Sequence, residues 1–398
     1  MKVLFWVDKF PTYSETFIRD QIISLIDNGI EVFIFSNHLK FDEIDSLKFF
    51  KSYNLTDKIL SYSSILPKDK KNKIYNIFKI LFRSIFTYNS LVYIKLFAKY
   101  FNTNRRFLLE NIFLLDFIIK NKINIIHAHF GPNGPRASLL KELGLKIKLF
   151  TTFHGYDIRL GQSRGLNFYK KLFDNSTGII SISNYNFENL LKFGAHSTKI
   201  FNIPNGINTE FFKRNEQISS GNKIKIVTVA RLVPEKGLHI AIEAVKKLIN
   251  KQPDLEIEYN IIGDGELKNS LEKLVIDYEL VNIVKLLGRK NSNEVRDFLI
   301  HSDIFILSSI SEALPTVIVE AQSCELPILA TNVGSIKDMV KGGIVVKSND
   351  LEAFEAGLLE LIKLRENWRI IGKQGRDFVI KNFDIQDQTK KIIDMYNI

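Results

Sequence analysis

Short apolar runs alternate with longer amphipathic stretches along the 398-residue chain. In the first half of the chain, the apolar runs predict β-strands over 2–7, 31–35, 123–129, 147–153 and 178–183. In the second half, they predict strands over 223–230, 257–263, 282–288, 303–309 and 327–331. Short buried strands that alternate with helices are typical of parallel sheets covered by helices on both faces. The pattern therefore predicts an α/β fold.

The two series of strands meet at the turn cluster Pro204–Asn205–Gly206, which favours a domain boundary. Each series is long enough for one doubly wound, Rossmann-like domain, and we expect the two domains to face each other across a cleft. The N-terminal domain is predicted over 1–203 and the C-terminal domain over 204–383. A last helix, 384–398, precedes no further strand and is expected to cross back to the N-terminal domain.

Composition favours a globular protein of a reducing compartment. Hydrophobic residues make up 45% of the chain and charged residues 25%. The longest charge-free part of the most apolar region has eleven residues, whereas a spanning helix needs about 20. The N-terminus reaches Asp8 too soon for a secretory signal, and the single cysteine, Cys324, has no internal partner for a disulfide. We therefore expect a cytoplasmic location.

Most of the net charge of +11 comes from one block, 67–122. This block has twelve Lys and Arg, three acidic residues and twelve Phe and Tyr, so its own net charge is 12 − 3 = +9. Apolar residues recur in it at helical spacing: Ile74, Ile77, Phe78, Leu81, Phe82 and Ile85. Two interpretations stay open: a helical insertion whose apolar stripe packs on the domain, or a helix that lies on an anionic membrane surface. A single aromatic-rich block does not favour nucleic acid as the partner.

Two glutamates, Glu312 and Glu320, enclose seven residues that are apolar except for Thr316. Pro315 is expected at the first position of a helix, so Glu312 lies in the preceding loop and Glu320 inside the helix. The free amides of that helix N-terminus favour a phosphate between the two carboxylates. A sugar, a diphosphate and a ribose follow one another in the same order, so the segment predicts a nucleotide-sugar site.

The stretch "EALPTVIVEAQSCELPILATNVGSIKDMV" resembles the signature region of glycosyltransferase family four, the retaining enzymes with the GT-B fold. The resemblance implies that Glu312 contacts the hydroxyls of the donor sugar and that Glu320 holds the ribose. It also implies that the backbone of the intervening loop holds the diphosphate, at Leu314, Pro315 and Thr316. The family usually has glycine where this chain has Ala313, so a difference in the loop backbone is expected there.

The segment "ARLVPEKGL" places Arg231 and Lys236 between a predicted strand and a helix. Two cations at the carboxyl end of a strand favour binding of a diphosphate leaving group, whose negative charge grows as the glycosidic bond breaks. The resemblance assigns the same role to both residues. Because no Asp-x-Asp triplet occurs in the chain, no metal ion is expected on the diphosphate.

The nucleotide has further candidate contacts in two glycine-containing loops. Gly263 and Gly265 follow a predicted strand, but Lys268 occupies the third glycine position of a dinucleotide fingerprint, which is therefore incomplete. The resemblance assigns these glycines to a close approach of the nucleotide. It assigns Gly288 and Arg289 to the segment beside the base.

The first half of the chain offers histidines at the ends of two predicted strands. His127 and His129 share a strand face, but no third ligand at suitable spacing is evident, so no metal site is expected. The resemblance implies that His154 faces the donor sugar and phosphate. The runs "SETFI", "HAHFG" and "TTFHGYD" look like those of bacterial colanic-acid and exopolysaccharide transferases. They supply the expected acceptor residues, which are Ser14, Glu15, His129, Gly131, Tyr156 and Asp157.

The resemblance implies a retaining, metal-independent hexosyltransferase of bacterial surface polysaccharide biosynthesis. Its donor would be a UDP- or GDP-linked sugar and its acceptor a glycan, lipid-linked in this class, with no other cofactor and no nucleic acid. Glu312 and Glu320 are expected to lie too far apart for the pair of carboxyl groups, about 5–5.5 Å apart, of a retaining glycosidase. A sugar-nucleotide epimerase, a phosphorylase-like enzyme and a non-catalytic glycan- or membrane-binding protein remain as alternatives.

Overall fold

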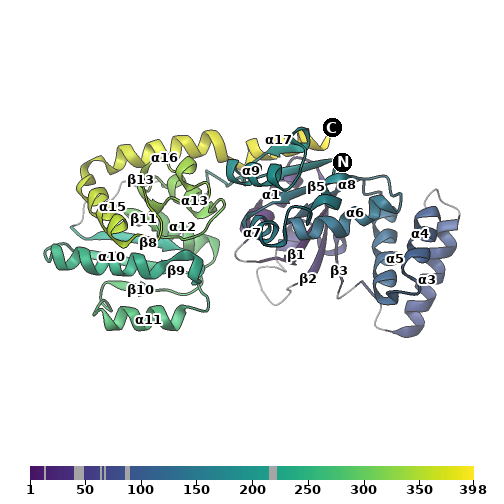
Figure 1. The fold of residues 1–398 in the computed structure, drawn as a ribbon, viewed down its shortest axis with the longest axis horizontal. Helices are drawn as coiled ribbons and strands as arrows, with labels where there is room; N and C mark the ends of the chain where they lie inside the picture. The colour runs from purple at the N-terminus through teal and green to yellow at the C-terminus, as the bar shows by residue number, and fades with distance from the viewer. Residues whose placement is uncertain (13–14, 40–48, 63–64, 67–68, 86–89, 215–221) are drawn as a thin grey trace. The chain divides into compact units, whose positions relative to one another are not determined.

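The computed structural model describes the chain except residues 13–14, 40–48, 63–64, 67–68, 86–89 and 215–221 (Figure 1). The chain divides into two compact units. The N-terminal unit comprises Met1–Pro204 together with Thr389–Ile398, and the C-terminal unit comprises Asn205–Gln388. Each unit is an α/β fold with its own sheet and its own hydrophobic core. No helix in the described part of the chain is long and apolar enough to cross a membrane.

The sheet of the N-terminal unit is parallel, with the strand order β3-β2-β1-β4-β5-β6-β7 among the described residues. Its strands are β1 (Lys2–Phe10), β2 (Glu31–Leu39), β3 (Ile59–Ser61), β4 (Ile125–His129), β5 (Lys148–Phe153), β6 (Gly178–Ser181) and β7 (Ile200–Asn202). Its α-helices are α1 (Thr16–Asp27), α3 (Lys70–Ile85), α4 (Ser90–Tyr100), α5 (Arg105–Lys120), α6 (Gly134–Glu142), α7 (Gly155–Arg164), α8 (Lys170–Asn175) and α9 (Asn184–Lys192). The basic block of the sequence thus contains three helices, α3 to α5.

The sheet of the C-terminal unit is also parallel, with the order β10-β9-β8-β11-β12-β13 among the described residues. Its strands are β8 (Ile224–Val229), β9 (Ile257–Ile262), β10 (Val284–Leu286), β11 (Ile304–Leu307), β12 (Ile328–Thr331) and β13 (Gly343–Val346). Its α-helices are α10 (Leu238–Lys251), α11 (Lys268–Asp277), α12 (Ser292–Ile300), α13 (Thr316–Ser323), α14 (Ile336–Met339), α15 (Leu351–Lys363) and α16 (Trp368–Phe383). The helix α17 (Ile385–Tyr396) ends the chain and has residues in both units.

The two sheets share one topology, which confirms the prediction of doubly wound α/β units. In each sheet the chain adds two strands on one side of the first strand and then crosses to its other side. The strand order therefore reverses between β1 and β4 in one sheet and between β8 and β11 in the other. In open α/β sheets, ligands bind outside the carboxyl ends of the strands at this reversal.

Three short strands were not predicted from the sequence: β3, β7 and β13. β7 lies just before the turn cluster at 204–206, and it pairs with β6 through three residues. A strand of three or four residues is too short to show a period of its own. Such a strand is defined by its pairing with a neighbouring strand, and the local sequence does not show that pairing.

Residues 3–7 of strand β1 are apolar at every position. Leu4 and Trp6 pack into the cluster on one face of the sheet, whereas Phe5 and its neighbours on the opposite face pack into another. Because successive side chains of a strand point to opposite faces, a strand covered on both sides favours apolar residues at successive positions. Burial of each large apolar side chain contributes about 1.5–3 kcal/mol relative to leaving it exposed.

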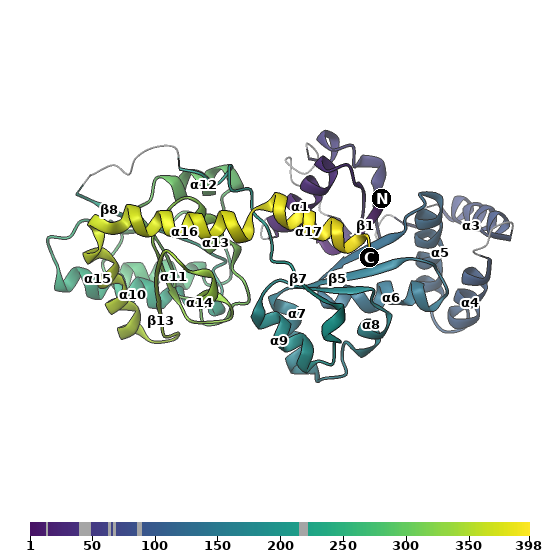
Figure 2. The ribbon, with the colours of Figure 1, turned by 90° about the horizontal axis from the view of Figure 1, so that it is seen from above.

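The last turns of α17 pack within the N-terminal unit (Figure 2). Tyr396 is fully buried, and its hydroxyl forms a hydrogen bond with Nδ1 of His127 in β4. Lys148 donates to the carbonyl oxygen of Tyr396 at 3.0 Å. Farther along the helix, the Thr389 hydroxyl donates to the Ser24 hydroxyl in α1 at 2.8 Å. The end of the chain is therefore part of the core of this unit.

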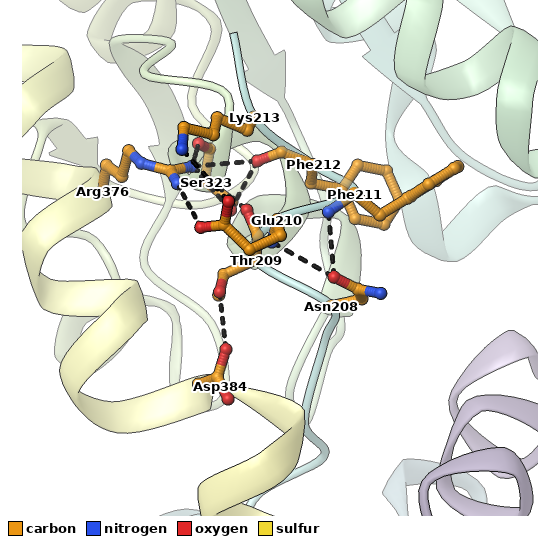
Figure 3. Close-up of polar contacts among 9 residues, drawn as sticks. All are labelled: Asn208, Thr209, Glu210, Phe211, Phe212, Lys213, Ser323, Arg376 and Asp384. Carbon is orange, nitrogen blue, oxygen red and sulfur yellow. Dashed lines mark hydrogen bonds and ion pairs between the residues drawn. The ribbon is translucent and has the colours of Figure 1, made fainter. Parts of the chain in front are cut away.

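Within the C-terminal unit, the buried guanidinium of Arg376 in α16 holds the start of the unit in place (Figure 3). It donates to the carbonyl oxygens of Thr209 at 3.3 Å and Phe212 at 3.1 Å, and also to that of Ser323 in α13. The Thr209 hydroxyl donates to Asp384, the residue that follows α16. The first and last segments of the unit are thus linked to each other by charge-assisted hydrogen bonds.

Three buried histidines stack at the carboxyl end of β4 and β5 in the N-terminal unit. The rings of His127 and His129 lie 4.6 Å apart between centroids, and those of His129 and His154 lie 5.5 Å apart. Burial lowers the pKa of His127 and of His154 to about 3, and it lowers the pKa of His129 well below the usual value. All three imidazoles are therefore neutral in the folded protein at neutral pH.

This cluster predicts that the protein loses stability as the pH falls from 7 to 5. Each histidine gains a proton in the unfolded state below about pH 6.5 but stays neutral in the folded state, so each costs about 2 kcal/mol at pH 5. Asp157 acts in the opposite direction, because burial raises its pKa to about 6 and the folded state then gains a proton first. That gain offsets only about 1 kcal/mol, so the net change remains a loss.

Urea unfolding between pH 7 and pH 5 measures this effect, with His239→Gln, at an exposed histidine outside the stack, as the control variant. His129→Asn is expected to reduce the slope of the unfolding free energy against pH by about one proton. A slope no steeper than that of a single histidine would contradict the prediction.

Candidate active site

The loops that follow β8 and β11 carry the three side chains to which the sequence pointed most directly. β8 and β11 are neighbours in the sheet, and the strand order reverses between them. Arg231 and Lys236 lie in the loop after β8, and Glu312 lies in the loop after β11. The fold thus brings residues separated by 76 positions, Lys236 and Glu312, to the edge where such sheets bind ligands.

Lys236 and Glu312 form a hydrogen-bonded ion pair. Their side chains are only 14% and 10% exposed, and the Ser309 hydroxyl donates to the same carboxylate oxygen at 2.7 Å. An ion pair with this little solvent is weakly screened, so each group strongly fixes the position of the other. Arg231 is exposed beside them in the sequence of the same loop. The arrangement provides a cation and a carboxylate that an incoming ligand can reach and separate.

The two loops meet through their backbones. The amide of Ile310 donates to the carbonyl oxygen of Glu235 at 2.7 Å, and the Ser308 hydroxyl donates to that of Gly237 at 2.8 Å. Gly237 has a φ of +55°, and a Cβ there would lie 2.4 Å from the Ser308 oxygen. Only glycine fits this conformation and this contact, so Gly237 sets the position of Lys236.

Gly263 and Gly265, which follow β9, lie at the same carboxyl edge of the sheet. A Cβ on Gly263 would lie 1.8 Å from the carbonyl oxygen of Ala230, and one on Gly265 would lie 2.4 Å from that of Leu232. The amide of Gly263 donates to the oxygen of Gly288 at 2.9 Å. The sequence interpretation assigned these glycines to an approach by a nucleotide. The structure shows that they first allow the loop after β9 to lie directly on the loop after β8.

Helix α13 begins between the two glutamates. Pro315 was expected at the first position of the helix, but it is the N-cap residue, and Thr316 is the first helical residue. Pro315 has a φ of −73°, which is close to the value that its ring favours. The helix therefore begins one residue later than predicted, but still between the two glutamates. Glu320 lies inside α13, and its side chain is half-buried. The first amides of a helix have no partner within it, so the anion site expected near Leu314, Pro315 and Thr316 stays a prediction, to which Pro315 has no amide hydrogen to contribute.

Ala313 does not have the left-handed backbone that a glycine at this position would suggest. It is absent from the described non-glycine residues with positive φ. The left-handed turn lies instead at Gly334, with a φ of +57°, where a Cβ would lie 2.3 Å from the carbonyl oxygen of Glu312. The amide of Ser335 donates to Ala313 at 3.0 Å. The loop after β12 thus supports the backbone of Glu312, and alanine is accommodated without strain.

In the N-terminal unit, His154 precedes α7 and has little exposure. Its Nε2 lies 3.2 Å from Nδ1 of His129, and its ring packs against Phe17 and Phe130. Its own Nδ1 has no hydrogen-bond partner within the described part of the chain. Asn186 donates to the carbonyl oxygen of His154 at 3.1 Å and so holds the backbone of His154 in place. This ring nitrogen is therefore buried and unpaired among the described residues.

Of the six acceptor residues expected from the sequence, three occupy buried structural positions: His129, Gly131 and Asp157. Asp157 is fully buried and accepts hydrogen bonds at 2.9 Å from the amides of Gly131 and His154. His129 is fully buried within the histidine stack, whereas Tyr156 is 59% exposed. Asp157, Gly131 and His129 thus shape the loops, and Tyr156 has a side chain that is exposed to solvent.

The remaining sequence-predicted residues are distributed as follows. Glu15 is half-buried at the start of α1, and Arg289 is exposed after β10. Ser14 lies outside the described residues. Sequence analysis missed Ser309 and Gly334, which hold the side chain and the backbone of Glu312. The position of Ser309 directly after a buried strand was a usable signal, whereas the contact of Gly334 depends on the fold.

Within the described ranges, no group of three or more His, Cys, Asp or Glu side chains is arranged to hold a metal ion. The rings of His127 and His129 stack with an interplanar angle of 24°, and both nitrogens of His127 bond to protein hydroxyls.

Two family models cover most of the chain. The model described as Glycosyltransferase Family 4 matches residues 14–211, and the model described as Glycosyl transferases group 1 matches residues 209–378. The two matches meet at the boundary between the two units. The C-terminal match contains the Lys236–Glu312 pair and helix α13.

Named relatives agree with these models. The chain is 31% identical to the colanic acid biosynthesis glycosyltransferase WcaL of Salmonella typhimurium, with 97% of each chain covered. It is 31% identical to the amylovoran biosynthesis glycosyltransferase AmsK of Erwinia amylovora, over 91% of this chain and 90% of that protein. An Escherichia coli UDP-Gal:α-D-GlcNAc-diphosphoundecaprenol α-1,3-galactosyltransferase is 28% identical, over 70% of this chain and 76% of that protein.

A solved structure supports the fold. HepE of Anabaena in complex with UDP superposes with a TM-score of 0.73 at 14% identity, with both chains covered completely. Its fold is GT-B, with two Rossmann-like units. The family models, the relatives and this likeness together show that the chain belongs to glycosyltransferase family 4 and is a glycosyltransferase with the GT-B fold.

Proposed function

We propose that this protein transfers a hexose from a nucleoside diphosphate sugar to a glycan acceptor, with retention of the anomeric configuration. The observation that carries the proposal is the Lys236–Glu312 ion pair at the reversal of the second sheet, next to the start of α13. A diphosphate needs cations and free amides, and a sugar needs a fixed carboxylate for its hydroxyls. The C-terminal unit provides all of these at one edge.

The donor is assigned residue by residue. Arg231 and Lys236 bind the diphosphate, together with the first amides of α13. Glu312 accepts hydrogen bonds from the sugar hydroxyls. Glu320 holds the ribose, and the loop with Gly288 and Arg289 lies beside a uracil or guanine base. Uracil has the stronger support, because HepE binds UDP and the galactosyltransferase relative is named for a UDP-linked donor.

The chemical step depends on stabilisation of the leaving group. As the bond from the anomeric carbon to the phosphate oxygen breaks, negative charge grows on the diphosphate, and two cations in a partly dry site oppose it. Arg231 and Lys236 take the place of a metal ion in this proposal. Neither glutamate is assigned as a nucleophile, and the departing phosphate accepts the proton of the acceptor hydroxyl. His154 is assigned to the sugar, with its unpaired Nδ1 as the candidate hydrogen-bonding atom.

The acceptor is proposed to be a lipid-linked oligosaccharide of exopolysaccharide assembly. WcaL and AmsK are named for the biosynthesis of colanic acid and amylovoran, and the galactosyltransferase is named for a diphosphoundecaprenol acceptor. Such an acceptor places the reaction at the cytoplasmic face of a membrane. The lone, buried cysteine agrees with a reducing compartment.

A donor screen tests the function. The purified protein is incubated with UDP- and GDP-linked hexoses and with polyprenyl-diphosphate-linked oligosaccharides, and mass spectrometry detects a gain of one hexose. NMR of the product assigns the anomeric configuration, and a parallel reaction in EDTA tests independence of metal ions. Inversion at the anomeric carbon, or activity that EDTA abolishes, would overturn the corresponding part of the proposal.

Removal of either donor-site cation is expected to reduce turnover strongly. Lys236→Ala and Arg231→Ala should each lower kcat by a factor on the order of 10² at saturating donor, because each removes a positive charge that faces developing negative charge. The matched control is Lys273→Ala, an exposed lysine on α11 of the same unit. Thermal melting checks that each variant is folded. Near-native turnover in a folded Arg231 or Lys236 variant would refute the role in the leaving group.

The two glutamates are expected to separate nucleotide binding from turnover. Glu320→Ala should weaken binding of UDP, since ribose contacts change little during the reaction. Glu312→Gln should bind UDP at least as tightly as the native protein, because its carboxylate no longer competes with the diphosphate for Lys236. The same variant should lose turnover of the sugar donor. Titration calorimetry with UDP measures the difference, and an equal loss of affinity in both variants would refute this division of roles.

A further inference from the structure

We infer that helices α3 and α4 form a docking surface for an anionic lipid membrane. Six large apolar side chains on these helices are between 51% and 69% exposed. They are Ile74, Tyr75, Phe78 and Phe82 on α3, and Leu91 and Ile94 on α4. We name this set the exposed stripe. Isolated exposed apolar residues are ordinary, whereas a patch of this size marks an interaction site.

The part of the exposed stripe that belongs to α3 lies on the side of this helix that faces away from the unit. At about 100° per residue, positions 74, 75, 78 and 82 fall on one face of a helix. The buried residues Ile80 and Ser84 fall on the other side, where α3 packs against α4 and α5. The views in Figures 1 and 2 show α3 and α4 at the outer edge of the N-terminal unit.

The exposure of these side chains bears on the two interpretations that the sequence left open for the apolar residues of α3. The side chains that recur at helical spacing do not act together. Ile77 and Leu81 are half-buried, and Leu81 packs against the core cluster, so this part of the stripe supports the domain. Ile74, Phe78 and Phe82 point outward. One helix therefore has a packing face and an exposed apolar face.

The charge around the exposed stripe identifies the partner. Between positions 70 and 109 the sequence has nine Lys and Arg and no Asp or Glu. Arg83 and Lys99 pair with Asp116 and Glu142, which lie outside that interval. Lys71, Lys79 and Lys95 have no ion pair within the described residues and are exposed. A surface with apolar groups and unpaired cations matches the anionic headgroups and acyl chains of a lipid interface.

Other occupants fit this surface less well. A second copy of the chain would bring two strongly basic faces together, and the repulsion between like charges opposes such a dimer. A nucleic acid would neutralise the lysines but offers no apolar medium to Ile74, Leu91 and Ile94. The inference also does not depend on the proposed sugar transfer, because the surface is separate from the donor site in sequence and in fold.

Flotation with vesicles tests the inference. The native protein should float with vesicles of equal parts phosphatidylglycerol and phosphatidylcholine at low salt, and not with phosphatidylcholine alone. Binding should decline in ~1 M salt, where the screening length is only ~3 Å. Exchange of Lys71, Lys73 and Lys79 for Gln should weaken partitioning by a factor on the order of 10², given the contribution of each cation near an anionic surface.

Two phenylalanine substitutions test the contribution of the apolar side chains to vesicle binding. Phe78→Gln combined with Phe82→Gln should reduce vesicle binding at least tenfold, since both rings are buried in lipid in the bound state. The matched control is Ile276→Gln combined with Lys273→Gln on α11, which changes the same kinds of exposed residue in the C-terminal unit and should not affect binding. Thermal melting again checks the fold of each variant.

A site-specific reporter shows whether the helix enters the lipid. The chain has two tryptophans, Trp6 and Trp368, and both are buried. In Phe78→Trp, a blue shift of the emission on anionic vesicles is therefore expected to arise from position 78. Absence of flotation and of the shift, with a folded native protein, would overturn the inference. So would salt-sensitive binding to single-stranded RNA without vesicle binding, or dimerisation that the Phe78 and Phe82 exchanges abolish.

Discussion

The candidate donor site depends on the close approach of backbones at the carboxyl edge of the second sheet. The loops after β8, β9, β11 and β12 contact one another at positions where a Cβ would lie 1.8 to 2.4 Å from a carbonyl oxygen. No side chain fits at such a distance, so Gly263, Gly237 and Gly334 are required by the fold before any ligand binds. Because these loops are in backbone contact, a movement of one loop also moves the residues of the loops that it contacts.

This constraint explains how Lys236 and Glu312 form an ion pair although they come from different loops. Gly237 fixes the end of one loop, Gly334 supports the backbone of Glu312, and Ser309 orients its carboxylate. In the ligand-free chain, the cation assigned to the diphosphate is thus neutralised by the acid assigned to the sugar. In the proposed function, a diphosphate sugar supplies both replacements at once, a phosphate for Lys236 and hydroxyls for Glu312. UDP alone would replace only the first, which would give the intact donor an advantage over the free nucleotide.

The alternation of apolar strands and helices was sufficient to predict both doubly wound units, because strands buried on both faces leave a clear pattern. The sequence also pointed to Lys236 and Glu312, which the fold brings together as an ion pair, since charged residues next to a buried strand have few structural uses. It did not reveal that Asp157 is buried, because a carboxylate that binds backbone amides has the same sequence appearance as one that binds a substrate. It also missed β13 and the contact of Gly334, which depend on pairing partners remote in the chain.

The burial of the histidines limits what His154 can contribute to phosphate chemistry. Its pKa lies at about 3, so its ring is neutral at neutral pH and adds no positive charge. In the proposed mechanism, the charge that opposes the growing negative charge of the diphosphate is therefore assigned to Arg231 and Lys236 alone. A neutral imidazole can still form a hydrogen bond to a hydroxyl or a phosphate oxygen. The role proposed for His154 is accordingly to orient the donor and not to stabilise the leaving group.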